Sequence, residues 1–111
     1  MKKPFLVALV MAAFAPIAGA NATNDRVAAM SESGRRTFAA LLVRQTGAQC
    51  PAATRTFFQG LLEKKDAVWN VSCNSRDNYA IVFYDDAAGT TRVMKCSELK
   101  ALGAPACFKK L

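Results

Sequence analysis

Four cysteines limit how this chain of 111 residues can fold: Cys50, Cys73, Cys96 and Cys107. In an oxidising compartment, an even number of cysteines in a small domain is typical of a disulfide framework, and four cysteines allow three pairings. A chain this short buries only about 60% of the surface that it exposes when unfolded, so cross-links supply stability that a small core cannot. Whether disulfides form depends on where the chain folds, which its N-terminus indicates.

The N-terminus has the pattern of a cleavable export signal. Two lysines follow the initial methionine, and residues 5–14 carry no charged or polar side chain. Pro16 and small residues at positions 18–20 come next, which predicts cleavage before Asn21, although a second small-x-small pattern overlaps this site. A retained membrane anchor is the competing interpretation, but it needs about 20 consecutive apolar residues. We therefore expect residues 1–20 to be a signal peptide and the mature protein to be periplasmic or secreted, without a transmembrane span.

The remaining 91 residues are predicted to form a single domain. Residues 21–33 are polar and small, so we expect a flexible lead-in or a frayed helical turn, followed by one α+β domain over residues 34–111. Residues 35–45 are predicted to form an amphipathic helix, because apolar side chains recur there with helical spacing: Phe38, Leu41 and Leu42.

Beyond Pro51 the period of the apolar residues changes from helical to twofold, as in β-strands. Turn-forming residues divide this region into four expected strands, at residues 54–62, 68–73, 79–84 and 91–96. A short helix is possible at residues 97–102. The sequence thus predicts an α+β fold, with one amphipathic helix packed on a three- to four-stranded antiparallel sheet and stapled by disulfides after the signal peptide is cleaved.

Alternation along the two central strands predicts which face of the sheet is buried. We expect three cross-strand pairs whose side chains share the face on which the helix packs: Cys73 with Tyr79, Val71 with Ile81, and Trp69 with Phe83. The opposite face is expected to carry a mixed set: Asn70, Ser72, Ala80, Val82 and Tyr84. Any register that places Met94 on the helix-packed face also places Cys96 there.

The same geometry restricts the disulfides. Cys73 and Cys96 would lie two strands apart, at about 9 to 10 Å, whereas a disulfide needs Cα atoms within about 7 Å. Two pairings remain: Cys50 with Cys73 and Cys96 with Cys107, or Cys50 with Cys96 and Cys73 with Cys107. We prefer the first, because it joins the segment entering the first strand to the second strand, and the C-terminal tail to the strand it has just left.

The chain offers little catalytic chemistry. It has no histidine, the commonest general base and metal ligand, and its cysteines show neither a Cys-x-x-Cys pattern nor zinc-type spacing. Asp85 and Asp86 are adjacent carboxylates, but beside Ala-Ala-Gly they are typical of a solvated turn. The aromatic residues that could stack on a ligand are more simply assigned to the core: Trp69, Tyr79, Phe83 and Phe57 or Phe58. We therefore predict no enzyme and no catalytic, cofactor-binding or metal-binding residue.

The mature part carries 13 basic and 8 acidic residues, a net charge of +5. Three basic pairs stand apart in the sequence rather than forming one stripe: Arg35-Arg36, Lys64-Lys65 and Lys109-Lys110. This spacing argues against nucleic acid as a partner. Contact with an anionic surface fits the charge, and so does ordinary solubility.

Short motifs follow the predicted helix in a fixed order: Phe57-Phe58-Gln59-Gly60, then residues 67–71, residues 78–82, and Ala88-Gly89 before residues 91–94. This order resembles the repeat of PepSY-type exported domains, in which a helix packs on antiparallel hairpins. The resemblance covers about residues 35–96. It implies a periplasmic binding or peptidase-restraining role and no catalytic residue. The cysteines and the tail from Ser97 lie outside that pattern and are more similar to those of small exported proteins of Gram-negative bacteria.

Together these patterns predict a non-enzymatic periplasmic module that interacts with or inhibits a protein partner, through an exposed sheet face or an edge strand. The alternative is a cationic protein that binds the envelope through lipopolysaccharide, phospholipid or a cell-wall polymer. No cofactor is expected. The partner is an unspecified protein of the periplasm or envelope.

Overall fold

A computed structural model describes residues 21–111, and the expected signal peptide lies outside the described residues. The elements follow in the order α2 (Ala22–Ala29), α3 (Glu32–Gln45), β1 (Ala53–Leu61), β2 (Ala67–Cys73), β3 (Tyr79–Phe83), β4 (Thr91–Lys95) and α4 (Cys96–Ala101). The strands form one antiparallel sheet in the order β1-β2-β3-β4. The predicted α+β class with an antiparallel sheet is therefore confirmed.

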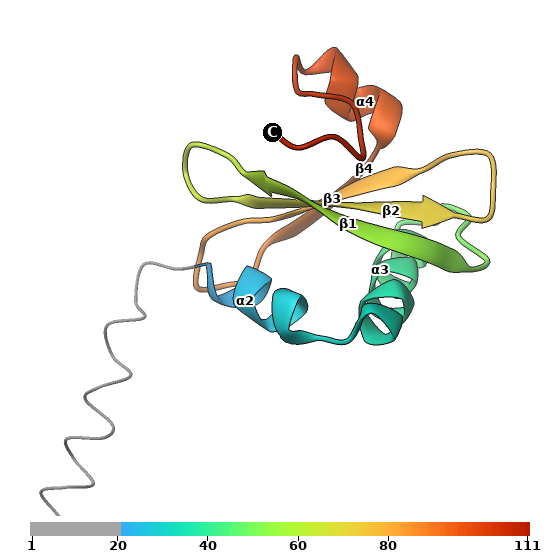
Figure 1. The fold of residues 1–111 in the computed structure, drawn as a ribbon, viewed down its shortest axis with the longest axis horizontal. Helices are drawn as coiled ribbons and strands as arrows, with labels where there is room; N and C mark the ends of the chain where they lie inside the picture. The colour runs from blue at the N-terminus through green and yellow to red at the C-terminus, as the bar shows by residue number, and fades with distance from the viewer. Residues whose placement is uncertain (1–20) are drawn as a thin grey trace, which may run out of the picture.

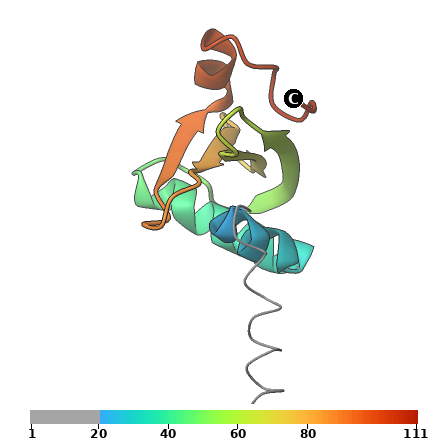
Figure 2. The ribbon, with the colours of Figure 1, turned by 90° about the vertical axis from the view of Figure 1, so that its left-hand side faces the viewer.

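The sheet lies between two layers (Figure 1). α2 and α3 cover one face, termed the helix face, while α4 and the C-terminal segment cover the other, termed the tail face. The view turned by 90° shows the same arrangement (Figure 2). Each face has its own core. The helix-face core includes Val43, Trp69, Val71, Ile81 and Phe83. The tail-face core is smaller and consists of Val68, Ala80, Val82, Met94 and Leu99.

α3 begins three residues earlier than predicted. Its N-cap is Ser31, whose Oγ accepts the N–H of Gly34 at 3.0 Å, so the helix starts as soon as a capping hydroxyl is available. Its buried residues are Ala39, Ala40 and Val43. Phe38 and Leu42 pack against the helix-face core as predicted, but Leu41 is 45% exposed. The side of α3 that faces the sheet is thus made mainly of small residues, which bring the helix close to the sheet.

Residues 21–33, expected to form a flexible lead-in or a frayed helical turn, contain the helix α2. Asn21 caps α2, because its Oδ1 accepts the N–H of Asn24, and its Nδ2 donates to the carbonyl of Phe83 at 2.9 Å. Asn24 in turn accepts the indole N–H of Trp69 at 2.7 Å. Amide side chains, with one buried valine, anchor this helix to the sheet. A search for apolar periodicity therefore misses it.

The predicted register of the central hairpin is wrong by two residues. Val71 lies opposite Tyr79 and Trp69 lies opposite Ile81, whereas Cys73 has no partner on β3. The Cys73 N–H donates instead to the side chain of Asn78 at 3.2 Å, which widens the turn. A shift of two residues preserves side-chain parity, so the predicted helix-face residues still share one face.

The reverse face differs from the expectation of a mixed surface. Met94 lies opposite Ala80 and therefore on the tail face, whereas Val93 lies opposite Ile81 on the helix face. Cys96 begins α4, which packs Leu99 against this second core. Both faces of the sheet are thus covered, and an exposed sheet face for a partner is excluded for the described residues.

Two disulfides join Cys50 to Cys73 and Cys96 to Cys107, with Cα atoms 4.9 and 5.7 Å apart. These are the two pairs that the sequence favours. The first connects the segment entering β1 to the end of β2. The second connects the first residue of α4 to the C-terminal tail. The disulfides therefore staple different layers of the molecule.

Candidate functional site

The C-terminal tail is held on the tail face by two buried amide side chains. Gln59 and Asn70 are both fully buried, and Asn70 Nδ2 donates to Gln59 Oε1 at 2.8 Å. Gln59 Nε2 donates to the carbonyls of Pro105 and Ala106 at 3.1 and 3.0 Å. Asn70 Oδ1 accepts the N–H of Phe108 at 2.7 Å. The two buried amides thus bond to each other and to the tail, which fixes the path of the tail across β1 and β2.

The end of the tail continues along β1. The Leu111 N–H donates to the carbonyl of Gln59 at 3.0 Å. A Cβ on Gly60 would come within 3.2 Å of the Leu111 side chain, so only glycine allows this approach at the bulge in β1. Phe108 has a φ of 66°, an uncommon conformation for this residue. Its hydrogen bond to Asn70 helps to hold it there and sets the direction of its ring.

The docked tail creates a cluster of cations and aromatic rings with β1, which we term the cation–aromatic patch: Arg55, Phe57, Phe108, Lys109 and Lys110. The guanidinium of Arg55 lies 4.6 Å from the Phe108 ring centroid and 5.4 Å from that of Phe57. The Lys110 ammonium lies 5.4 Å from the Phe57 centroid. Arg55, Lys109 and Lys110 are exposed, and the two rings are half-buried. Cations over ring faces stabilise such an arrangement while remaining accessible to solvent.

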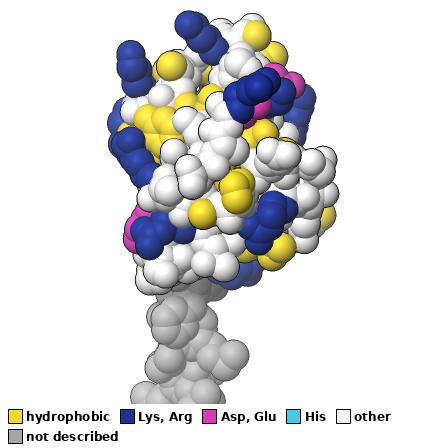
Figure 3. All heavy atoms as spheres, turned by 90° about the vertical axis from the view of Figure 1, so that its right-hand side faces the viewer, with side chains coloured by type: hydrophobic (Ala, Val, Ile, Leu, Met, Phe, Trp, Pro, Cys, Tyr) yellow, Lys and Arg dark blue, Asp and Glu magenta, His cyan; other side chains and the backbone are white. Residues whose placement is uncertain are grey.

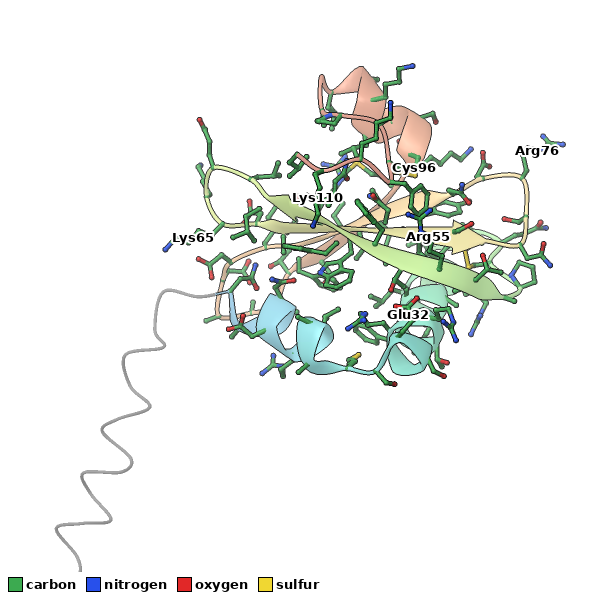
Figure 4. All side chains as sticks on the ribbon, in the orientation of Figure 1. Glu32, Arg55, Lys65, Arg76, Cys96 and Lys110 are labelled. Atoms are coloured by element: carbon green, nitrogen blue, oxygen red, sulfur yellow. A yellow bond between two sulfur atoms is a disulfide. The ribbon has the colours of Figure 1, made fainter. Side chains whose placement is uncertain are left out.

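The β1 edge of the sheet is partly closed by side chains (Figure 4). Glu32 on α3 accepts the backbone N–H of Thr56 at 3.1 Å and its hydroxyl at 2.7 Å. Lys110 donates to the carbonyl of Phe58 at 2.8 Å. Together with the Leu111 bond, these contacts occupy backbone groups that an added strand would use.

The same contacts change the pKa of the Glu32 carboxylate. Partial burial raises its pKa, but hydrogen bonds from Thr56 and Arg35 lower it by more, and the pKa falls below its ordinary value of 4.5. Glu32 also lies 3.4 Å from a guanidinium nitrogen of both Arg35 and Arg36. Its contacts are structural, since they connect α3 to the edge of the sheet.

β4 forms the other edge, and no segment within residues 21–111 pairs with its outer side. The N–H of Tyr84 donates to the carbonyl of Thr90 at 2.9 Å, which fixes the phase of the ladder. Because bonded positions alternate in antiparallel strands, Thr91 and Val93 direct their N–H and C=O groups away from β3. The N–H of Lys95 is already bonded at the start of α4. The open edge therefore offers four backbone groups.

Charge is unevenly distributed. The turns at residues 62–66 and 84–90 meet at one end of the sheet, where the Asp85 N–H donates to the Asp66 side chain. Together with α2, these turns contain five of the eight acidic residues and three basic ones. The rest of the described chain carries ten basic and three acidic residues. Figure 3, which views the opposite end, shows basic side chains at several places and few acidic ones. The positive excess therefore lies away from the acidic turns.

The carboxylates and aromatic rings that the sequence offered as candidate site residues have structural roles. Asp86 accepts the N–H of Thr90 at 2.9 Å, and the Thr90 side chain and backbone lower its pKa, as in a capped turn. No group of His, Cys, Asp and Glu among residues 21–111 could hold a metal ion. The rings of Trp69, Tyr79 and Phe83 belong to the helix-face core, and Trp69 and Phe83 line a cavity of about 10 Å³.

The basic pairs separate in space. Arg35 donates to three carbonyls at the end of α2 and stacks over Trp69 at 5.2 Å, so it is structural, whereas Arg36 lies in the wall of a groove between α3 and residues 51–53. Lys109 and Lys110 join Arg55 in the cation–aromatic patch. Sequence spacing missed this patch because its members are about 50 positions apart. The polar residues Gln59 and Asn70 inside otherwise apolar strands were the one signal for it.

Comparisons of the chain with models of protein families, with curated proteins and with solved structures found no match. The resemblance to PepSY-type domains therefore stays a prediction. Within residues 21–111, no helix has the length and apolar character needed to cross a membrane.

Proposed function

We propose that the protein is a non-enzymatic, exported binding module that adds an extended segment of a partner protein to the outer edge of β4. The observation that carries this proposal is the asymmetry of the sheet. Both faces are covered and β1 is partly closed, whereas β4 presents unpaired backbone groups. Strand addition is a common way for a sheet edge to bind peptides, because the backbone bonds supply affinity and alternate side chains supply specificity.

The partner segment should carry acidic side chains. Arg92 and Lys95 on β4 and Lys100 on α4 are all exposed. The Lys95 ion pair with Asp77, at 3.8 Å, is itself exposed and worth little energy. An acidic strand would find Arg92 near the start of β4 and Lys95 at its end, which favours the correct partner and its register.

The same charges argue against a second copy as the occupant. Antiparallel pairing of two β4 edges centred on Arg92 would place the Arg92 side chains of the two copies directly opposite each other. Like charges on neighbouring strands are destabilising. The open edge therefore favours a different protein over self-association.

Site-specific cross-linking tests this proposal. Arg92 is replaced by a photo-reactive amino acid in the exported protein in living cells, and the cross-linked protein is identified by mass spectrometry. We expect one acidic partner, and we expect its yield to fall at least about tenfold when Thr91→Pro is added, because proline removes an outward N–H and blocks an approaching strand. Since this N–H points away from β3, the β3–β4 ladder keeps its bonds.

Two controls distinguish strand addition from general adhesion. Thr91→Val keeps the N–H and should preserve the cross-link. The photo-reactive group at Arg55, on the opposite edge, should not capture the same partner. Equal capture from both positions, or a yield that Thr91→Pro leaves unchanged in a folded protein, would contradict the proposal.

A further inference from the structure

We propose that the cation–aromatic patch on β1 and the tail binds the surface of an anionic phospholipid bilayer. This site is separate from the β4 edge, and the proposal does not depend on strand addition. It rests on three features of the described residues: clustered cations, exposed apolar side chains beside them, and a rigid support.

The cations come first. Figure 4 shows Arg55 and Lys110 over β1, and Lys109, which lies between Phe108 and Lys110 in the tail, is exposed as they are. The salt bridges within the described chain involve other basic residues. Arg55 and Lys110 are held by aromatic rings and by one carbonyl, which leave their charge uncompensated. Such cations attract the phosphate groups of an anionic membrane.

Apolar side chains lie beside these cations. Leu111, which follows Lys110 and packs on Gly60, is 43% exposed. Phe57 and Phe108 are half-buried between the cations. A surface that combines large apolar side chains with lysine and arginine is suited to the boundary between headgroups and acyl chains. A soluble anion would use only the cations, so Leu111 and the two rings favour a bilayer.

The support is rigid. The tail that carries Phe108 and Lys109 is fixed by Asn70 and by the disulfide between Cys96 and Cys107. The side chains are therefore presented together without the cost of ordering a loose segment on binding. β1 and β4 are opposite edges of the sheet, so a membrane at β1 would leave the β4 edge accessible.

Vesicle sedimentation tests the proposal with the disulfide-bonded protein. The partition coefficient is measured on phosphatidylcholine vesicles with and without about one quarter phosphatidylglycerol, over a series of salt concentrations. We expect binding only to the anionic vesicles, weakened by salt. The double variant Arg55→Gln/Lys109→Gln should bind about 30-fold more weakly, since each cation near the surface contributes a factor of about five.

The matched control is Arg26→Gln/Arg76→Gln, which removes the same charge from exposed positions on α2 and the β2–β3 turn. Its partition coefficient on the anionic vesicles should fall by less than about fivefold, because only the general attraction of the net charge is reduced. Leu111→Ser should also weaken binding, while leaving its salt dependence unchanged. Equal losses in the two double variants, no binding to anionic vesicles, or full competition by soluble polyphosphate would overturn the proposal.

Discussion

At the scale of the residue, Glu32 shows how one side chain connects separate elements. It belongs to α3, yet its carboxylate accepts two hydrogen bonds from Thr56 on β1. It also lies beside Arg35, which itself binds the carbonyls at the end of α2. Glu32 thus helps to fix both helices relative to the sheet and protects part of the β1 edge.

The pKa of Glu32 predicts a pH dependence of stability. Because the pKa is lowered in the folded protein, the ionised carboxylate stabilises the fold fully above the unfolded value, near 4.5, and this contribution is lost as the pH falls through the folded value. We therefore expect Glu32→Gln to lower the urea midpoint at about pH 7 and to approach the wild type at about pH 3. Unfolding can be followed by the fluorescence of Trp69.

The control for this prediction is Glu63→Gln. Glu63 is an exposed residue of the β1–β2 turn, so its substitution should leave the midpoint almost unchanged. A deficit in Glu32→Gln that stays constant from neutral to acidic pH would show that lost packing, rather than the charge, is responsible.

At the scale of the element, the tail behaves as an extra layer docked through amides. Asn70→Leu removes the partners of Gln59 Oε1 and of the Phe108 N–H while keeping a similar side-chain size. We expect the free energy of unfolding to fall by about 2 to 4 kcal/mol, because two buried groups lose their hydrogen bonds. Urea unfolding measures this loss, and hydrogen exchange should show faster exchange at residues 104–111.

Ser72→Ala on the same strand is the matched variant and should change stability by less than about 1 kcal/mol. If Asn70→Leu were equally harmless, or if the tail amides exchanged no faster, the amides would not be what holds the tail.

The sequence predicts the four strands to within about one residue at each end, because apolar alternation and turn residues mark them clearly. It fixes the parity of the central hairpin but not its offset, since a shift of two residues leaves the apolar pattern unchanged. The sequence does not predict the docking of α2 and of the tail, for a different reason. Asn21, Gln59 and Asn70 hold them by long-range hydrogen bonds, and a polar residue in a sequence is normally read as exposed.

In the candidate site, too, local sequence patterns are predictable and long-range contacts are not. The spacing of the cysteines and the limit on disulfide length favour the pairs seen in the structure. The cation–aromatic patch combines Arg55 with Phe108 and Lys109, and only the docking of the tail brings them together. The open β4 edge was expected in general terms, but the sequence could not decide which edge is open, because that depends on the position of Glu32 and the tail.

At the scale of the whole molecule, the sheet separates two cores, and each has its own cross-link. By the chain-entropy estimate each disulfide contributes about 3 kcal/mol. Cys50→Ala/Cys73→Ala should lower the global stability and speed exchange throughout the helix face, since Cys50 is also part of that core. Cys96→Ala/Cys107→Ala should loosen α4 and the tail first, while the helix face stays protected.

Hydrogen exchange with and without each pair of substitutions checks this prediction. Uniform loss of protection in both variants would indicate that the two cores unfold as one unit. Wild-type protein under oxidising conditions provides the reference, because both disulfides are present in it.

The position of the second disulfide has a consequence for maturation. Before Cys96 and Cys107 join, no disulfide holds the tail over residues 58–60, so a chain that has not yet been oxidised can expose this part of the β1 edge together with β4. Chains with unpaired backbone groups at both edges of the sheet can pair edge to edge into polymers. Oxidation of this cysteine pair therefore serves as a safeguard against aggregation, in addition to its contribution to stability.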